Sequence, residues 1–392
     1  MSSPVTGSTL DPAPTPARRP AAGRRSFRPS VPTLLRIVLV VVVAILPIYL
    51  DQSFMQTGLF AMAAILGAIG LTILTGSAGQ LSLAHAFFLA IGAYGYAYFA
   101  GASGGPGSAG ASGLGLPSAL AMVLAVLAAG VAGLLFSPIS GRLRGIYLGV
   151  ASLSLVFIGS FALENFTSIT GGFNGRAIPD LSMFGFTFAD SNPPLTVLNV
   201  PYGRFERLWY LSLVLVILGY VFAKNVLRGR PGRAMQTMRD SEVAAAVMGV
   251  NVRLTKAGAF VLSSMYAGLA GVLLSLVFTH VVPDYFNLAL SVSYLAMVVI
   301  GGLGSVGGAA LGAVFVSVLP QLLTRYSSSL PFVAQPGSGG YDPGVVSSLL
   351  YGVVVIVVVV FAPGGLAGLS RRLTVRRRQR PTASDPTSVP QV

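Results

Sequence analysis

Apolar segments of membrane-spanning length recur along almost the whole of this 392-residue chain. A helix that crosses the hydrocarbon core of a bilayer needs about 20 predominantly apolar residues. Segments that meet this requirement lie near 34–50, 57–75, 81–100, 118–136, 145–163, 208–224, 257–279, 286–303, 306–323 and 344–362. We therefore predict an all-α fold, a polytopic transmembrane helical bundle of about ten spans. Nine to eleven spans are compatible with the sequence, because glycine-rich stretches could hide a broken helix.

The positions of the basic residues predict the orientation of this bundle. The chain carries 25 Lys and Arg residues and a net charge of +14. Cytoplasmic segments that border membrane spans are enriched in Lys and Arg. With the N-terminus inside, both termini are cytoplasmic. The only basic residues left on the outer side are then Arg176, Arg204, Arg207 and Arg325.

The same distribution divides the chain into three parts. Residues 1–33 and 370–392 are predicted to be disordered basic cytoplasmic tails, and residues 34–369 form the transmembrane domain. Within this domain, 225–256 is predicted to be a cytoplasmic segment and 164–207 an extracytoplasmic loop. Because the basic clusters border apolar spans, membrane lipid is their predicted partner and nucleic acid is not.

Several function classes are excluded by what the sequence lacks. It has no cysteine and only two histidines, so neither thiolate chemistry nor a Cys- or His-based metal centre is expected. We predict no cofactor, no metal and no catalytic residue. No Asp, Glu or Lys lies in the middle of a predicted span, whereas ion-coupled carriers generally need such groups at membrane depth. The apolar spans suit a path for a neutral or zwitterionic solute, with the driving force supplied elsewhere.

A glycine-rich stretch at 76–86 joins two predicted spans with almost no loop. Backbone groups exposed at membrane depth are tolerated only inside protein or along a wet cavity. The stretch is therefore either a hydrogen-bonded helix junction or part of a translocation path, and 304–307 partly repeats its pattern. Its candidate residues are Gly76, Gly79, Gln80, Ser82 and His85. Ser77-Ala78-Gly79-Gln80 resembles an ATP-binding-cassette signature, but the sequence contains no Gly-Lys pair and hence no phosphate-binding loop.

The basic segment 225–256 contains a second pattern. Asp240 or Ser241 can cap a short helix, and Gly249 can end it. An apolar stripe follows the helical period along this segment, formed by Val243, Ala246, Val247 and Val250. Such a helix can lie flat on lipid or insert into a groove on a soluble partner, and the pattern alone is compatible with both.

Several longer stretches of the sequence form a pattern in a fixed order: LTGSAGQLSLAHA at 74–86, RGIYL at 144–148, TGGFNG at 170–175, GRAM at 232–235, RDSEVAAAVMGVN at 239–251, AGLAG at 267–271, GGLGSVGG at 301–308 and PGGLAGL at 363–369. With these stretches the sequence resembles the M-type (LivM type) permease subunits of branched-chain amino-acid ABC importers. The resemblance covers the membrane region from about 57 to 370 and implies a multi-pass permease domain in a bacterial plasma (inner) membrane.

The resemblance also implies partners and contact residues. Permeases of this kind carry a cytoplasmic coupling loop related to E-A-A-x-x-x-G that docks on an ATP-binding subunit. Its counterparts here are Arg239, Asp240, Glu242, Ala244, Ala245 and Gly249, with Gly249 one position later than the pattern. The implied partners are a second, H-type permease, two ATP-binding cassette ATPase subunits and an extracytoplasmic solute-binding protein. That protein would dock on the outer loop at Thr170, Gly171, Gly172 and Asn174, although the loop could equally be a lid.

The implied function is ATP-driven alternating access for branched-chain amino acids, with hydrolysis on separate subunits, so that the chain itself is not an enzyme. Urea or short amides are alternative substrates, because similar permeases handle them. A secondary carrier or channel that needs no ATPase partner is the alternative from a different class.

Overall fold

The computed structural model describes residues 31–102, 111–143, 145–183, 185–190, 195–197, 200–326, 343–361, 364, 365 and 368. The predicted tails lie outside the described residues, apart from positions 31–33. Arg144 and most of the predicted motif at 363–369 also lie outside them. The chain divides into two compact units, residues 1–45 and 46–392. The first unit contains α1 (Val31–Ile45), and everything below concerns the second.

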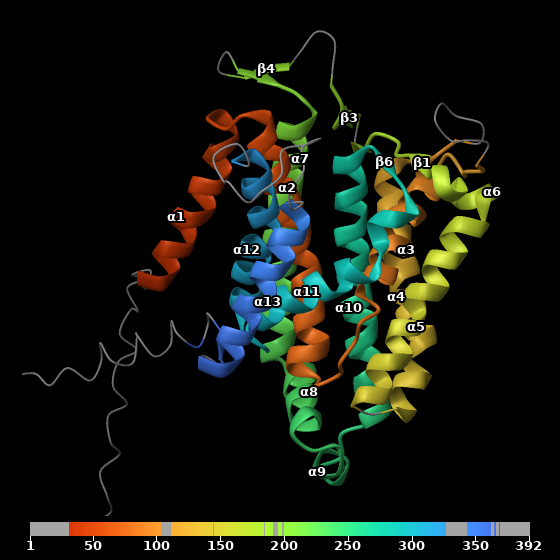
Figure 1. Ribbon diagram of the computed structural model, residues 1–392, viewed down its shortest axis with the longest axis vertical. Coiled ribbons are helices and arrows are strands. Elements are labelled where there is room, and N and C mark those ends of the chain that lie inside the picture. Colours follow the sequence, from red (N-terminus) through yellow and green to blue (C-terminus); the bar gives the residue numbers. More distant parts are fainter. Residues whose placement is uncertain are drawn as a thin grey trace, which may run out of the picture. The chain divides into compact units, whose positions relative to one another are not determined.

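Helices dominate the described part of the second unit (Figure 1). The longer ones are α2 (Gln52–Leu71), α3 (His85–Ala100), α4 (Ser118–Arg142), α5 (Ile146–Asn165), α7 (Arg204–Arg228), α8 (Arg230–Asp240), α10 (Val252–Phe278), α11 (Leu288–Gly301), α12 (Val306–Arg325) and α13 (Pro343–Phe361). The short ones are η1 (Leu46–Ile48), the π-helix η2 (Thr72–Ser77), α6 (Thr167–Thr170), η3 (Gly172–Asn174), α9 (Glu242–Val247) and η4 (Pro283–Phe286). The helical class of the fold is as predicted.

Each predicted span overlaps one of the described helices. Among the described residues, seven helices are long and apolar enough to cross a membrane. They correspond to α2 with η2, α4, α5, α7, α10, η4 with α11, and α12. Shorter apolar stretches occur at Val38–Ile48 and Val345–Val358. The chain is therefore a polytopic helical protein, and the total of about ten spans stays a prediction.

Short strands gather at one end of the bundle, and α8 and α9 lie at the other (Figure 1). The strands form antiparallel pairs: β1 (Arg176–Ala177) with β6 (His280–Val281), β2 (Ser182–Met183) with β3 (Phe186–Thr187), and β4 (Leu195–Val197) with β5 (Val200–Tyr202). The loop 164–207 and the segment 225–256 thus occupy opposite ends, as their predicted placement on opposite membrane sides requires.

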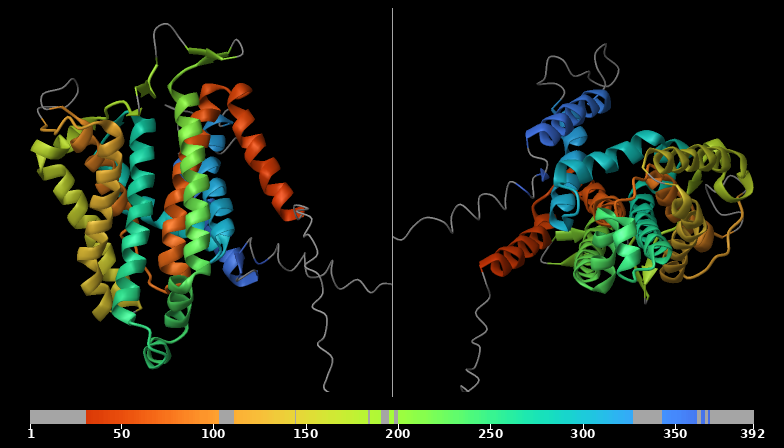
Figure 2. Two further views of the ribbon diagram at one scale, coloured as in Figure 1. Left: turned by 180° about the vertical axis from the view of Figure 1, so that it is seen from behind. Right: turned by 90° about the horizontal axis from the view of Figure 1, so that it is seen from below.

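The core of the bundle is built around α2 and α10, which are mostly buried, whereas few residues of α7 are buried. Figure 2 shows α7 running the length of the bundle beside α2 and continuing into α8. Helices in lipid associate through close packing rather than through the hydrophobic effect, and small residues allow their backbones to approach closely. Gly268 of α10 illustrates this: an added Cβ would lie 2.5 Å from the Cβ of Ala129 on α4.

The spans near 57–75 and 81–100 are joined differently from the prediction. The first helix continues as η2 to Ser77, and α3 begins only at His85. Residues 78–84 between them are not helical, and Figure 1 shows them as the orange tube between the lower end of α2 and α3. The expectation of a tight turn with almost no loop was wrong, because residues 78–84 form a non-helical connection in which a buried side chain accepts a backbone hydrogen bond.

Candidate functional site

Serine side chains on helices distant in sequence accept hydrogen bonds from the non-helical segment 78–84 and from the first turn of α3. The backbone N–H of Leu83 donates to Ser152 Oγ on α5 over 2.8 Å. The N–H of Ala86 donates to Ser291 Oγ on α11 over 2.9 Å. Both serines are buried, and the sequence analysis did not single them out. They satisfy backbone groups that could not remain unpaired at membrane depth.

The polar side chains predicted at this junction are all buried. Ser82 Oγ accepts the N–H of Ala84 over 3.3 Å. Gln80 is 6% exposed, and its Oε1 has no hydrogen-bond partner among the described residues. His85 packs against Tyr294 of α11 with ring centroids 4.7 Å apart. None of these side chains belongs to the described lining of either cavity discussed below, and their role as helix junction or translocation path stays a prediction.

Arg239, at the end of α8, reaches this junction. Its Nη1 donates a hydrogen bond to the carbonyl oxygen of Gly76 over 2.9 Å. A Cβ on Gly79 would lie 2.7 Å from Arg239 Cγ, and Gly79 has a φ of +69°. A Cβ on Gly76 would lie 2.8 Å from the Cα of Gly304. The two glycine stretches that resemble each other in sequence are therefore in contact, with Arg239 beside both.

Glu242, the first residue of α9, turns toward the bundle. Its Oε1 lies 2.7 Å from Nζ of Lys256 on α10. The side chain of Lys256 is 1% exposed. A buried ammonium needs such a partner, because an uncompensated charge in a low dielectric costs several kcal/mol. The predicted coupling residue thus also connects α9 to α10.

The predicted ends of α9 are confirmed. Ser241 Oγ accepts the N–H of Ala244 over 3.2 Å as the helix N-cap. Gly249 follows the helix with a φ of +82°, which favours glycine. Ala245 is buried against the rest of the segment, and Asp240 forms an exposed ion pair with Arg239 over 3.2 Å.

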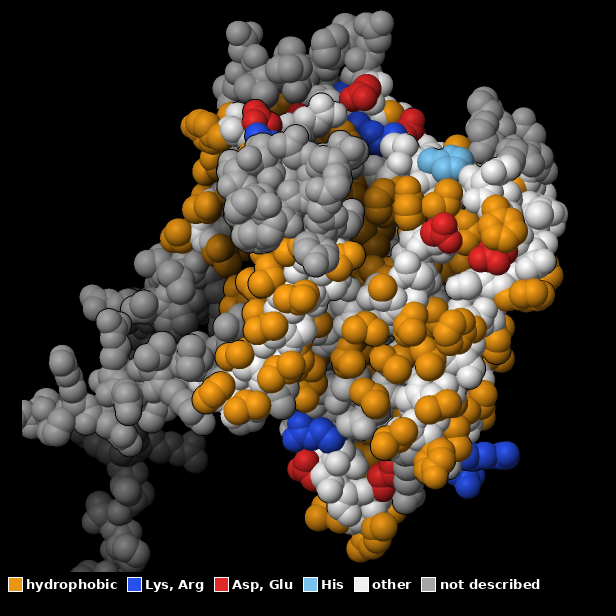
Figure 3. Space-filling view, viewed as in Figure 1, with side chains coloured by type: hydrophobic (Ala, Val, Ile, Leu, Met, Phe, Trp, Pro, Cys, Tyr) orange, Lys and Arg blue, Asp and Glu red, His pale blue; other side chains and the backbone are white. Residues whose placement is uncertain are grey.

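An apolar tip projects from the end of the bundle that carries α9. It consists of Val243 (70% exposed), Val247 (85%), Met248 (73%) and Leu254 (70%). Figure 3 shows hydrophobic side chains at the lower extremity, below a band of charged groups. The apolar stripe predicted Val243 and Val247, but Met248 and Leu254 follow a turn and lack a periodic signal. Contiguous exposed apolar side chains at a polar end of a molecule are typical of a docking surface.

The predicted residues of the outer loop stabilise that loop. Thr170 is buried, and its hydroxyl donates to the carbonyl of Leu163 at the end of α5 over 2.6 Å. Gly171 and Gly172 have φ values of +78° and +64°. The carbonyl of exposed Asn174 lies 2.8 Å from Nε2 of His280 beside the β1–β6 pair. Docking of a binding protein on this loop stays a prediction.

Arg176 fixes the same loop from within. It is 1% exposed, and its Nη1 donates to the carbonyls of Ile169 over 2.6 Å and Ser112 over 3.1 Å. Burial lowers the pKa of Arg176 from its usual value. A guanidinium nevertheless stays charged at neutral pH, so these bonds are charge-assisted.

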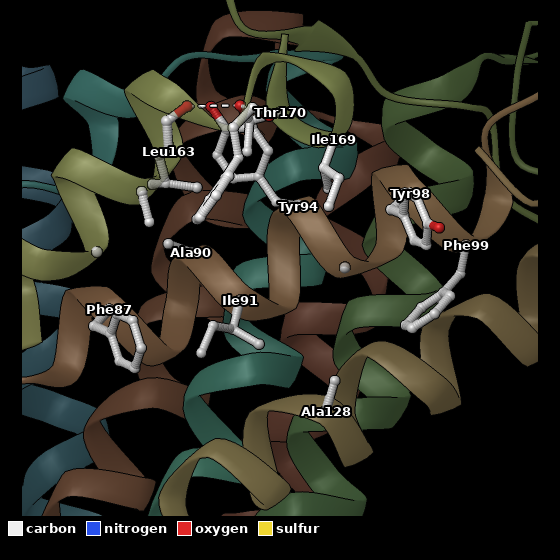
Figure 4. Close-up of a pocket in the computed structure, with 14 residues that line it drawn as sticks. Phe87, Ala90, Ile91, Tyr94, Tyr98, Phe99, Ala128, Leu163, Ile169 and Thr170 are labelled. Carbon is white, nitrogen blue, oxygen red and sulfur yellow. Dashed lines mark hydrogen bonds between the residues drawn. The ribbon is translucent and has the colours of Figure 1, made fainter. Parts of the chain in front are cut away.

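Two cavities lie among the helices. One, of about 270 Å³, lies between α3, α4, α5 and α6, and its wall is formed almost wholly by hydrocarbon and aromatic side chains such as Phe87 and Ile91 (Figure 4). The other, of about 410 Å³, is a cleft between α2, α10, α11, α12 and α13 that combines aromatic side chains with hydroxyl and amide groups. The sequence analysis identified neither, because their residues lie on separate helices and carry no local motif.

Comparison with known proteins agrees with this architecture. Residues 53–359 match the family described as branched-chain amino acid transport system / permease component. The chain is 30% identical over 352 residues to the high-affinity branched-chain amino acid transport system permease protein LivM of Salmonella typhimurium, covering 86% of this chain and 75% of that protein. It is 29% identical to LivM of Escherichia coli, with the same coverage.

The chain is also 25% identical over 286 residues to LivH of Salmonella typhimurium, covering 72% of this chain and 88% of that protein. No solved structure matches it. The family match and the similarity to LivM both extend far beyond the glycine motifs. The chain therefore belongs to the family of permease components of branched-chain amino-acid transport systems.

Proposed function

We propose that this chain is a permease subunit of an ABC importer and forms a translocation path for branched-chain amino acids. ATP hydrolysis on two separate cassette subunits drives alternating access, in which the helices rock around a central path. The relatives support the substrate class, since they are described as branched-chain amino-acid transport permeases. Charge-poor spans suit a solute whose side chain is apolar and whose own charges cancel.

One observation carries the proposal: the apolar tip around α9 is connected to the bundle on both sides. Arg239 bonds to Gly76 in η2, just before the tip, and Glu242 pairs with Lys256 in α10 at its base. A partner that held Val247 and its neighbours would therefore move two helices of the core rather than a free loop. This is the arrangement that force transmission from a cytosolic ATPase requires.

The remaining partners follow from the same assembly. The second permease would be of the H type, which is also similar to this chain. An extracytoplasmic solute-binding protein would dock on the loop 164–207, at the end opposite the tip. This assignment puts the apolar tip in the cytoplasm and the protein in a bacterial inner membrane, in the orientation that the basic residues predict.

Replacement of Val247 by Glu tests the ATPase contact. A carboxylate in an apolar contact costs more than about 1.4 kcal/mol, so co-purification of the ATPase subunit should fall at least about tenfold. Phe173→Glu, an equally drastic change at the opposite end, is the matched control and should leave co-purification unchanged, because Phe173 is also largely exposed. Equal recovery of the ATPase with both variants would remove the assignment of the tip.

A further inference from the structure

We propose that the cleft between α2, α10, α11, α12 and α13 is the site where this subunit holds the transported amino acid. This inference rests on the proposed function and specifies where the substrate binds within it. The volume, about 410 Å³, lies in the usual range for small-molecule sites. The walls of the cleft differ in chemistry, and this difference identifies the ligand class.

Aromatic rings form one part of the lining, called the aromatic wall below. Phe60 of α2 and Phe278 of α10 have ring centroids 4.9 Å apart. Tyr285 of η4 stacks on Phe278 at 4.6 Å. Three separate elements thus contribute rings to one surface. An aliphatic side chain of leucine, isoleucine or valine gains by leaving water for such a surface.

Hydroxyl and amide groups on neighbouring helices form another part of the lining. They come from Ser293 of α11 and from Ser317 and Gln321 of α12. The Ser293 hydroxyl donates to the carbonyl of Ala289 over 2.9 Å, so its oxygen remains available as an acceptor for an ammonium group. The Gln321 amide can donate to a carboxylate and accept from an ammonium.

No Asp, Glu, Lys or Arg belongs to the described lining of this cleft. A zwitterion, whose two charges lie close together, can be held by neutral dipoles. A cationic or anionic side chain would remain uncompensated there, at a cost of several kcal/mol. The cleft therefore selects amino acids with uncharged, apolar side chains.

Comparison with the smaller cavity argues against lipid as the occupant of this cleft. The cavity between α3, α4, α5 and α6 has an almost wholly apolar wall, which suits an acyl chain. A lipid chain in the larger cleft would face Ser317 and Gln321 with hydrocarbon and leave their polar groups without partners. The hydroxyl and amide wall is explained by a polar end of the ligand.

One contact connects the cleft to the coupling region. Tyr294 and Met297 line the cleft, and the ring of Tyr294 packs against His85. His85 begins α3 directly after the non-helical segment 78–84, in which Gly79 lies beside Arg239. A shift of α8 would thus act on a chain of contacts that ends at the lining of the cleft, which provides a route for release of the amino acid.

The absence of native cysteines allows a direct test. Ser317→Cys is introduced into the assembled importer, and the rate of maleimide labelling of this chain is measured with and without leucine. At a leucine concentration about ten times its dissociation constant, labelling should slow about tenfold. Thr324→Cys, on the same helix outside the cleft, is the matched control and should be labelled at the same rate with and without leucine.

Two results would overturn the assignment. Labelling at Ser317→Cys that leucine leaves unchanged would show that the amino acid does not occupy the cleft. Labelling blocked by assembly with the second permease alone would show that a protein segment fills it. If ATP-dependent leucine uptake remains intact, either result rejects the cleft as the binding site but leaves the proposed function standing. Leucine uptake that does not depend on ATP would reject the proposed function itself.

A second variant gives a readout of specificity. Phe278→Ala removes the central ring of the aromatic wall and should lower leucine uptake about tenfold relative to alanine uptake, because the larger side chain loses more contact. An unchanged ratio of the two rates would contradict the role of this wall.

Discussion

Arg239 Nη1 and the carbonyl oxygen of Gly76 are 2.9 Å apart, in a hydrogen bond that joins the end of α8 to the π-helix η2. The two residues come from segments that the sequence associates with different roles, one with ATPase coupling and the other with a helix junction. Their contact joins the two segments directly.

Arg239→Ala should uncouple the transporter. It removes a charge-assisted bond whose loss costs about 1.5–3 kcal/mol, together with the packing over Gly79. We expect the ATPase to remain associated while amino-acid uptake per ATP hydrolysed falls about tenfold. Arg233→Ala is the control, since Arg233 bonds only locally, to the carbonyl of Arg228. Equal uptake per ATP in the two variants would contradict the relay.

Gly76→Ala should destabilise the contact between η2 and the turn before α12. The added methyl would meet the backbone of Gly304, which cannot move aside as a flexible side chain would. Overpacking of this kind costs about 1–3 kcal/mol, and the thermal unfolding temperature should fall accordingly. Gly307→Ala is the matched control, because its methyl would meet only Tyr220 Oη at 3.6 Å. A Gly76→Ala protein as stable as Gly307→Ala would show that the contact is loose.

Glu242 and Lys256 should behave as a buried ion pair. Glu242→Gln leaves the nearly inaccessible ammonium of Lys256 without its carboxylate, at a cost of about 3–5 kcal/mol. Lys256→Met combined with Glu242→Gln should recover much of that loss, because the buried charge is removed as well. Thermal unfolding of the single and double variants measures the difference, and additive destabilisation would mean that the residues do not interact.

Arg176→Met should loosen the outer loop. The variant leaves the carbonyls of Ile169 and Ser112 without their charged donor, which costs about 1–3 kcal/mol. Amide hydrogen exchange should therefore accelerate around α6 and β1, while α9 at the opposite end remains unchanged. Unaltered exchange at α6 would show that the guanidinium is dispensable to the loop.

Much of this fold could be predicted from the sequence. The bilayer demands long apolar helices, so hydropathy located every described helix of that kind, and the caps at Ser241 and Gly249 located α9. The non-helical segment 78–84 escaped prediction because Leu81, Leu83 and Ala84 continue the apolar pattern of a helix. The tertiary hydrogen bond from the backbone N–H of Leu83 to Ser152 Oγ, which helps to make this connection tolerable, has no signal in the local sequence.

The candidate site was less predictable for a similar reason. The ion pair of Glu242 depends on how α9 folds back on α10, and no local pattern specifies Lys256 as the partner. Phe60 and Phe278 look the same in sequence as aromatic residues that face lipid. Only the packing of five helices brings them into one cleft together with Ser317 and Gln321.

Leucine uptake into proteoliposomes tests the central claim most directly. The vesicles would contain this chain, its H-type partner and the ATPase subunits, with loaded binding protein outside and nucleotide inside. The account predicts uptake that requires ATP hydrolysis and is lost with Val247→Glu, but not with Arg233→Ala, whose guanidinium bonds to the nearby carbonyl of Arg228. Uptake that proceeds equally without ATP, or that is unaffected by Val247→Glu, would contradict it.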